Sequence, residues 1–183
     1  MKLIDVTTDT AFQHRVAEIL IDGFDATGVQ PWLSVDDAFE EVAESVGDER
    51  VSRAAIDENG DIIGWIAGFN SYSFVWELHP LVVRADSQGR GIGRALVEDF
   101  ENIVRERGGM TIMLGTDDEN ERTTLGGIDL YPDVLGKLSA IRDRGRHPFG
   151  FYLKMGYEIS GVVPDANGFG KPDILMCKRV SRP

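Results

Sequence analysis

Apolar positions near the start of the chain predict a short strand at residues 3–6 and then two helices. From about residue 10 to residue 24 the apolar residues recur at helical spacing and fall near one face. A second helix begins at Ser34, a residue type favoured at N-caps, and is expected to end near Gly47. We expect the chain to break between the two helices, at Gly23, Gly28 and Pro31.

Strand-like runs separated by turn residues follow the helices. Residues 51–56 and 62–69 flank Asn59-Gly60, a pair typical of tight hairpin turns. A turn at residues 70–73 then leads into a third apolar run, residues 74–83. Three consecutive strands of this kind predict an antiparallel meander.

Helical spacing returns in the second half of the chain. It starts at Ile92 and stops at Gly108-Gly109, after which residues 110–114 read as a buried strand. Residues 115–146 are polar and irregular, with one weak helical patch around residues 134–141. The last expected elements are a short helix and two strands, at residues 148–155, 157–163 and 174–180. Strands and helices therefore mix, which predicts an α/β fold on a mixed sheet.

Length and composition fit one globular domain over residues 1–183. The chain is 42% hydrophobic and 27% charged, with a formal net charge of −12. A nucleic-acid partner is disfavoured, because affinity for phosphate backbones rests largely on clustered cations. An acidic surface suits a cationic small molecule, and it is equally consistent with solubility alone.

Signals for export, for a membrane span and for a metal are missing from the sequence. The N-terminus meets Thr and Asp residues too soon for a signal peptide, and no apolar run approaches the roughly 20 residues of a membrane span. The single Cys177 is expected to be buried and inert in the last strand. His14 and His147 pair with no carboxylate at a metal-ligand spacing. We expect a cytoplasmic protein with no metal and no membrane partner.

A glycine-rich segment, Gln88 to Arg94, lies between a predicted strand and a predicted helix. The first amides of a helix lack internal partners and carry the positive end of its dipole. Glycine lets the backbone approach an anion closely, so a pyrophosphate is a natural ligand here. The spacing matches neither a dinucleotide-binding fingerprint nor a Walker loop. A turn that only connects strand to helix remains the alternative.

Two segments resemble the motifs of one enzyme family. Residues 81–93, which end in Gln88-Gly89-Arg90-Gly91-Ile92-Gly93, resemble the acetyl-CoA motif of the GCN5-related N-acetyltransferases (GNAT). Residues 149–158 resemble the second motif of that family. The resemblance implies a GNAT fold, in which a central twisted mixed sheet with two splayed strands is flanked by helices. The splayed strands would be residues 74–83 and 110–114, with a bulge at Pro80.

The same resemblance implies that acetyl-CoA is the cofactor and that backbone amides of the glycine-rich segment hold its pyrophosphate. The implied contacts are Leu81, Val82, Val83, Gln88, Gly89, Arg90, Gly91, Ile92, Gly93, Arg94 and Tyr152. A backbone amide of Leu81 or Val82 would stabilise the oxyanion formed during transfer.

The expected reaction is attack of a neutral amine on the acetyl thioester. A base must accept a proton first, because alkylammonium groups have a pKa near 10. Glu77 and His79 alternate on one strand, so they share a face and either can be the base. Each also has a non-catalytic alternative: Glu77 only binds the cationic substrate, and His79 only hydrogen-bonds a neighbouring backbone group. By the resemblance, Tyr152 occupies the position of the family's general acid. The alternative is that its ring only packs against neighbouring aromatic residues.

Carboxylates and aromatic residues beside these elements are the candidates for binding the acceptor. They are Trp32, Tyr72, Trp76, Glu77, Asp117, Asp118, Glu119 and Asp173. An insertion at about residues 120–147 departs from the family pattern. It is a lid over the acceptor, a dimer element or a surface excursion.

Over its whole length the chain also resembles aminoglycoside 6′-N-acetyltransferases, which implies acetylation of the 6′-amine of an antibiotic and a role in resistance. Two alternatives stay open. One is N-acetylation of another small amine, a polyamine, an amino acid or a peptide N-terminus. The other is a non-catalytic acyl-CoA-binding regulator. Members of the family are often dimers, so a homodimer is expected by resemblance alone.

Overall fold

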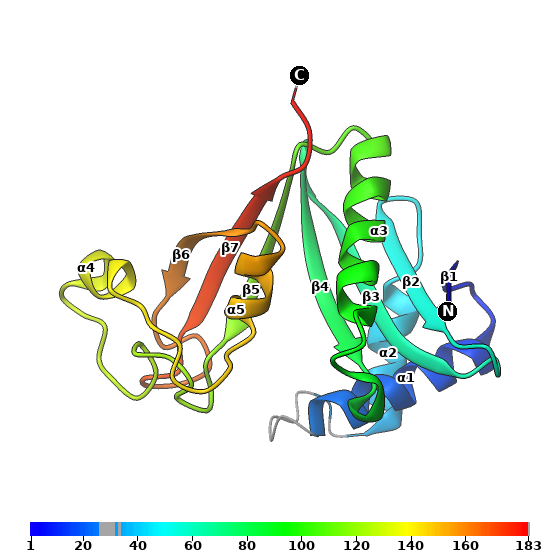
Figure 1. The fold of residues 1–183 in the computed structure, drawn as a ribbon, viewed down its shortest axis with the longest axis horizontal. Coiled ribbons are helices and arrows are strands. Elements are labelled where there is room, and N and C mark those ends of the chain that lie inside the picture. Colours follow the sequence, from blue (N-terminus) through cyan, green and yellow to red (C-terminus); the bar gives the residue numbers. More distant parts are fainter. Residues whose placement is uncertain (26–31, 33, 183) are drawn as a thin grey trace. The chain divides into compact units, whose positions relative to one another are not determined.

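The computed structural model describes residues 1–25, 32 and 34–182 (Figure 1). These residues form two compact units, which we describe separately. The first comprises Met1–Ile112 with the C-terminal residues from Val180, and the second comprises Met113–Arg179. The expected chain breaks at Gly28 and Pro31 lie outside the described residues. A single domain over residues 1–183 stays a prediction.

The first unit is an antiparallel sheet of four strands with helices on both faces (Figure 1). Its elements are β1 (Lys2–Asp5), α1 (Thr10–Asp25), α2 (Val35–Glu44), β2 (Arg50–Ile56), β3 (Ile62–Tyr72), β4 (Val75–Val83), the short 3₁₀ helix η1 (Ala85–Ser87) and α3 (Ile92–Glu106). The strands follow the order β1-β2-β3-β4, and each pairs antiparallel with the next. The predicted meander and both predicted N-terminal helices are therefore confirmed.

The second unit contains most of β5 (Thr111–Asp117), which begins at the end of the first. It continues with α4 (Val134–Ser139), α5 (Phe149–Lys154), β6 (Glu158–Val163) and β7 (Asp173–Arg179). Its strands follow the order β5-β7-β6, with β6 and β7 antiparallel. α4 lies inside the predicted insertion, where the weak helical patch was expected.

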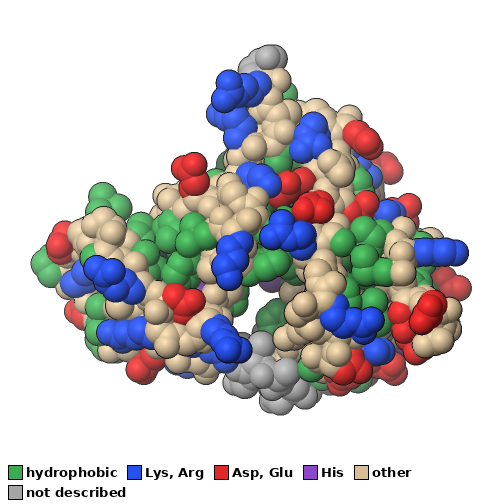
Figure 2. Space-filling model, in the orientation of Figure 1, with side chains coloured by type: hydrophobic (Ala, Val, Ile, Leu, Met, Phe, Trp, Pro, Cys, Tyr) green, Lys and Arg blue, Asp and Glu red, His purple; other side chains and the backbone are tan. Residues whose placement is uncertain are grey.

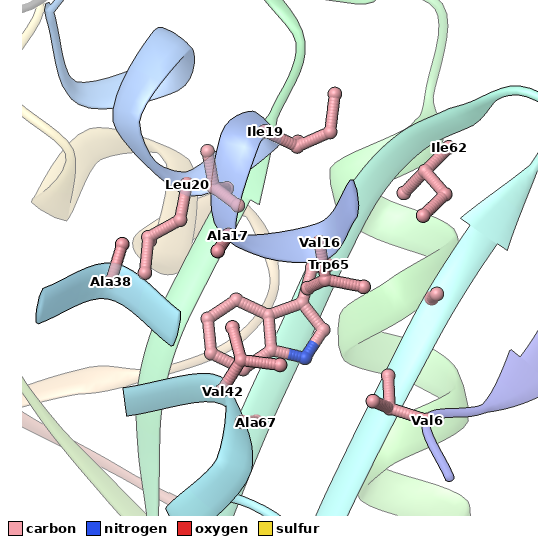
Figure 3. Packing of buried hydrophobic residues seen from close by; sticks show 12 residues of the cluster. Val6, Val16, Ala17, Ile19, Leu20, Ala38, Val42, Ile62, Trp65 and Ala67 are labelled. Atoms are coloured by element: carbon pink, nitrogen blue, oxygen red, sulfur yellow. The ribbon is translucent and has the colours of Figure 1, made fainter. Parts of the chain in front are cut away.

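Trp65 lies at the centre of the first unit's core, between β3 and the pair α1 and α2 (Figure 3). Its side chain is fully buried, and its indole Nε1 donates to Ser52 Oγ at 2.9 Å. Ser52 Oγ also shares a hydrogen bond of 2.7 Å with Ser45 Oγ, just after α2. The buried indole N–H is thus satisfied, which avoids a cost of about 1–3 kcal/mol for an unpaired polar group.

The opposite face of the same strand is covered by α3, and glycine makes room for it. A Cβ at Gly68 would lie 2.5 Å from Phe100 Cζ and 2.2 Å from Glu77 O. No side chain fits there, so α3 approaches β3 closely. Since successive residues of a strand face opposite sides, Trp65 and Gly68 lie under different helices.

The structure differs from the predictions at a turn and at a glycine of the first unit. β3 runs to Tyr72, so the turn is Ser73-Phe74, because cross-strand pairing extends the hairpin beyond the polar Asn70. Gly23 lies within α1, where a Cβ would be 2.0 Å from a methyl group of Val82. The glycine is therefore there for close packing and does not break the helix.

Cys177 is half-buried, so its predicted burial is wrong. The side chains of Ile174 and Met176 are fully buried, and Cys177 follows Met176 by one position on the opposite face of β7. Its Sγ donates to Ser160 Oγ at 3.2 Å.

No helix among the described residues is long and apolar enough to cross a membrane. In the same part of the chain, no group of three or more His, Cys, Asp or Glu side chains could hold a metal ion.

Candidate functional site

The glycine-rich segment leads into the N-terminus of α3 as predicted, and the short helix η1 stands between this segment and β4. Gly89 and Gly91 have φ angles of +73° and +84°, and an added Cβ at either position would meet nothing within 4 Å. Backbone amides from Gly89 to Arg94 donate no hydrogen bond to any described acceptor. The segment is thus an exposed turn whose amides are available to an external anion.

Side-chain contacts hold the start of this turn. Arg84 Nε donates to Asp86 Oδ1 at 2.7 Å, and Ser87 Oγ donates to the same oxygen at 2.8 Å. These two donors hold the pKa of Asp86 below its usual value. Gln88 Nε2 donates back to Val83 O at 3.0 Å, which ties the turn to the end of β4. The geometry is therefore set before any ligand arrives.

This turn fits the pyrophosphate of coenzyme A. Unpartnered amides at a helix N-terminus bind anions through both direct hydrogen bonds and the helix dipole. Arg90 and Arg94 are exposed and add positive charge on either side. Arg94 Nη1 lies 3.7 Å from Glu98 Oε1, a contact that leaves it at the surface.

A bulge interrupts β4 at the predicted position. Along β3 the register moves two residues, from Ile66 to Gly68, while along β4 it moves three, from Leu81 to Leu78. The extra residue falls at His79-Pro80, whose peptide bond is cis. Pro80 therefore marks a bulge inside the strand, which continues to Val83.

The amides at the end of β4 differ in whether they face β3. Arg84 N donates to Ile63 O at 3.1 Å, so the Arg84 amide faces β3. Amides alternate in direction along a strand, which turns the amide of Val82 toward β3 and that of Leu81 away from it. Leu81 is thus the better of the two predicted oxyanion donors, because its N–H is not committed to β3.

Glu77 and His79 lie on the face of β4 that is turned toward α1 and α2. Glu77 pairs with Phe69, which lies on the same face of β3 as Trp65. His79 Nε2 is 3.8 Å from Glu41 Oε1 on α2, and the His79 side chain is 55% exposed. The sequence did not single out Glu41, because only the packing of α2 on the sheet brings it near His79.

Tyr152 lies in α5, in the second unit, and only 7% of its surface is exposed. Its ring makes edge contacts with Phe151 and Tyr157, at centroid distances of 5.1 Å and 5.4 Å. Burial raises the pKa of Tyr152 above its usual value. The phenol therefore keeps its proton at neutral pH, as a proton donor must.

The acidic residues after β5 differ in what they can do. Asp118 is 1% exposed, and its oxygens accept from the amides of Arg122 and Thr123 at 2.6 and 2.9 Å. Its carboxylate is thus committed to holding the start of the insertion. Asp117 is exposed and accepts a hydrogen bond from Asn167 Nδ2.

Two further acidic candidates belong to the same unit as Asp117. Glu119 Oε2 lies 3.8 Å from Lys171 Nζ. Asp173 is half-buried at the start of β7, and a Cβ at Gly115 would lie 2.4 Å from its carboxylate. Asp118 N donates to Pro172 O at 2.9 Å, so the end of β5 and the start of β7 are adjacent. The structure brings these carboxylates to one end of the second unit.

The aromatic candidates do not gather in one place. Trp76 is buried beside the end of α3, where the Arg107 guanidinium lies 5.5 Å from its ring centroid, on the face opposite Glu77. Trp32 packs edge-on against Phe24 at 5.1 Å. Tyr72 is 66% exposed at the end of β3.

Figure 2 shows one face of the molecule, with basic side chains scattered among apolar and acidic ones rather than gathered in one patch. One helix, α2, carries only acidic charge. That helix carries no Lys or Arg, and its ionisable residues are Asp36, Asp37, Glu40, Glu41 and Glu44.

Comparison with known proteins identifies a family. The profile of the Acetyltransferase (GNAT) family matches residues 14–136. A crystal structure of an aminoglycoside 6′-N-acetyltransferase complexed with coenzyme A is 37% identical, with a TM-score of 0.88, and the match covers 100% of this chain and 99% of that one. The aminoglycoside 6′-N-acetyltransferase from Enterococcus faecium is 38% identical, with a TM-score of 0.87 and the same coverage.

An aminoglycoside 6′-acetyltransferase of type Ii is 34% identical, with a TM-score of 0.73, and both chains are covered completely. No curated protein matches the chain significantly. The predicted α/β fold class is confirmed by these structures. The splaying of residues 74–83 from 110–114 stays a prediction.

Proposed function

Because the chain belongs to the acetyltransferase (GNAT) family, we propose that it acetylates aminoglycosides, with acetyl-CoA as the donor and the 6′-amine as the acceptor. One observation carries the substrate: at 34% identity or more, the likeness to three aminoglycoside 6′-acetyltransferases extends over the full chain. The family itself establishes an N-acetyltransferase.

The glycine-rich turn would hold acetyl-CoA. Amides from Gly89 to Arg94 would receive the pyrophosphate, and Arg90 would add a charge-assisted contact. When bound, acetyl-CoA supplies an activated acetyl thioester. The amide of Leu81, which points away from β3, would donate to the carbonyl oxygen of that thioester as negative charge develops on it.

Protons would move at two places. Glu77 or His79 would accept a proton from the substrate ammonium, directly or through water, so that the amine can attack. Tyr152 would give its phenolic proton to the departing sulfur. Its buried, protonated state suits that task. Glu41, whose Oε1 lies 3.8 Å from His79 Nε2, would be a second carboxylate near the first of these steps.

An aminoglycoside is a polycation, and the negative charge of this protein supports it as the acceptor. The net charge of the chain is −12, and α2 presents a face of carboxylates. We assign Glu77, Asp117, Glu119 and Asp173 as its anchors, with Tyr72 as an exposed aromatic contact. Asp118 is left out because its carboxylate is already engaged.

The finer parts of the proposal concern the cell. We propose that the enzyme works in the cytoplasm, where acetyl-CoA is made, that it confers aminoglycoside resistance, and that it is a homodimer. Expression of the protein in a susceptible host should raise the minimum inhibitory concentration of an aminoglycoside. Expression of the Tyr152→Phe variant should not. Sedimentation equilibrium measures the mass in solution against the 20.2 kDa of one chain.

Release of free thiol from acetyl-CoA tests the activity. The acceptors are two aminoglycosides that differ only in a 6′-amine or a 6′-hydroxyl, together with spermidine, free amino acids and a short peptide. Turnover on the 6′-amine compound alone supports the proposal. Turnover only on another amine would keep the family chemistry and refute the substrate. Tight binding of coenzyme A with no turnover on any acceptor would favour the alternative function, a non-catalytic acyl-CoA-binding regulator.

A further inference from the structure

A buried histidine outside the predicted site joins three segments of the second unit. His147 is 2% exposed and lies just before α5. Its Nε2 is 3.0 Å from Asp117 O at the end of β5. Its Nδ1 accepts from the Phe149 amide, the first of α5, at 3.3 Å. Its own backbone amide donates to Asp143 Oδ1 at 3.1 Å.

The two ring partners fix the protonation state of this histidine. A carbonyl oxygen can only accept, so Nε2 must carry the hydrogen that points to Asp117 O. A backbone amide can only donate, so Nδ1 must present its lone pair to Phe149. The neutral ring with hydrogen on Nε2 is the one form that satisfies both contacts.

The same contacts close the insertion. Asp118 accepts from the amide and the hydroxyl of Thr123, at 2.9 and 2.7 Å, and Thr123 forms a β-bridge with Asp143. Asp143 in turn holds the amide of His147. A continuous set of hydrogen bonds therefore runs from the end of β5, through the insertion, to the start of α5.

Tyr152 depends on where α5 begins. Its amide donates to Pro148 O at 3.4 Å, next to His147, and its carbonyl accepts from Met155 and Tyr157 at 3.0 Å each. α5 spans only Phe149–Lys154, so it has little helix of its own to hold its position. A shift of its first turn moves the phenol with it.

We propose that His147 is a positioning residue for the general acid: its neutral ring links β5 to the first turn of α5 and so places the Tyr152 hydroxyl. This inference rests on the proposed function, since it assigns Tyr152 as the acid. The link itself, from the His147 ring to Asp117 O and to the Phe149 amide, is present in the unligated protein and can be tested without catalysis.

Acid should release the link. A proton added at Nδ1 would face the N–H of Phe149, and that hydrogen bond would be lost. The charged groups that face the ring are the carboxylates of Asp118 and Asp143 and the guanidinium of Arg122. Burial dominates over these and lowers the pKa of His147.

The direction of the pH effect follows from that shift. The unfolded chain binds the proton more readily than the folded one, at a pKa near 6.5. The contribution of His147 to stability is therefore complete above that pH. It falls progressively as the pH drops from about 6.5 toward the lower pKa of the folded protein.

Two variants separate the two ring contacts without a titrating group. In His147→Asn the side-chain oxygen takes the place of Nδ1 and can still accept from Phe149. In His147→Gln the amide nitrogen takes the place of Nε2 and can still donate to Asp117 O, but the acceptor is gone. Thr116→Val is the matched control, because it removes a buried hydrogen bond from β5 to Ile174 O (3.1 Å) without touching α5.

Amide hydrogen exchange on the unligated protein tests the link itself. We expect the Phe149 amide to exchange at least tenfold faster in His147→Gln than in the parent, and at near-parent rates in His147→Asn and Thr116→Val. As the pH falls through the lowered pKa of His147, the parent should lose protection at Phe149, relative to the chemical exchange rate, and His147→Asn should not. Equal protection in all variants would overturn the proposal, whether or not the enzyme acetylates aminoglycosides.

A double-mutant cycle with Tyr152→Phe tests the positioning role. His147→Gln should lower kcat by roughly tenfold and leave KM for acetyl-CoA within about twofold. In the Tyr152→Phe background the same substitution should have no further effect on kcat. An equal loss in both backgrounds would show that His147 acts on something other than Tyr152. Thr116→Val should reduce stability but not kcat.

Discussion

Gly91 and Gly108 offer a matched test of the acetyl-CoA turn, because they stand at opposite ends of α3. Their φ angles are +84° and +79°, and an added Cβ at either position would meet nothing within 4 Å. Substitution by alanine should therefore strain the backbone equally in both places. Only at Gly91 would the new methyl group project from the turn whose amides are unpartnered.

The magnitude of the folding effect follows from backbone geometry. A left-handed conformation costs a non-glycine residue about 1–2 kcal/mol. Alanine recovers about 0.4–1 kcal/mol by restricting the unfolded chain. We therefore expect both Gly91→Ala and Gly108→Ala to lower the free energy of unfolding by about 1 kcal/mol, or about 2–4 °C in Tm.

The binding effect should appear in one variant only. A methyl group that displaces the pyrophosphate from one amide removes a hydrogen bond to a charged group, worth about 1.5–3 kcal/mol. Gly91→Ala should thus weaken coenzyme A binding roughly 10- to 100-fold, and Gly108→Ala should leave it unchanged. Isothermal titration calorimetry measures both affinities, and urea unfolding measures both stabilities. Equal affinities in the two variants would refute the assignment of this turn as the anion site.

Four more substitutions test the general acid, the packing of α3 and the choice of base. Tyr152→Phe should lower kcat about 100-fold or more while the Kd of coenzyme A stays within about twofold, and an unchanged kcat would remove the phenol from the mechanism. Gly68→Ala should cost about 2 kcal/mol or more in urea unfolding, because its Cβ would overlap Phe100 and a β4 carbonyl; a stable variant would contradict the close approach of α3. Glu77→Gln and His79→Gln should separate the candidate bases in kcat/KM, the true base losing about 100-fold and the other residue less, and equal small losses would exclude both.

Much of the fold could be predicted because local signals and tertiary packing agree. Ser34 caps α2 as expected, its Oγ accepting from the Asp37 amide at 3.1 Å. Asn59-Gly60 turns the chain between β2 and β3, with Gly60 at a φ of +88°. Pro80 signalled the bulge in β4 because proline cannot donate to a strand ladder. Each of these features depends on a few consecutive residues.

The features that the sequence did not predict share a physical cause: each depends on a contact between residues far apart in the sequence. Gly23 looks like a helix breaker until Val82 is seen packed against it. Glu41 is one of many carboxylates on α2, and only the sheet brings His79 to it. His147 gave no sequence signal at all, because its burial depends on the closed insertion.

In the candidate site, too, features set by consecutive residues could be predicted and features set by distant contacts could not. Gln88 to Arg94 could be read as an anion-binding turn from the sequence, because the chemistry resides in consecutive backbone amides. The choice between Leu81 and Val82 could not, because it required the hydrogen bond from Arg84 N to Ile63 O. Asp118 looked like a substrate anchor and is instead buried within its own loop.

The fate of the acetyl group tests 6′-N-acetylation directly. The enzyme is supplied with acetyl-CoA labelled with ¹³C in the acetyl carbonyl and with an aminoglycoside that bears several amines. Two-dimensional NMR of the product then locates the label. We expect a single labelled amide, on the 6′ nitrogen, formed in equal amount to the free thiol. Label on any other nitrogen, or thiol release without a labelled aminoglycoside, would refute acetylation of the 6′-amine.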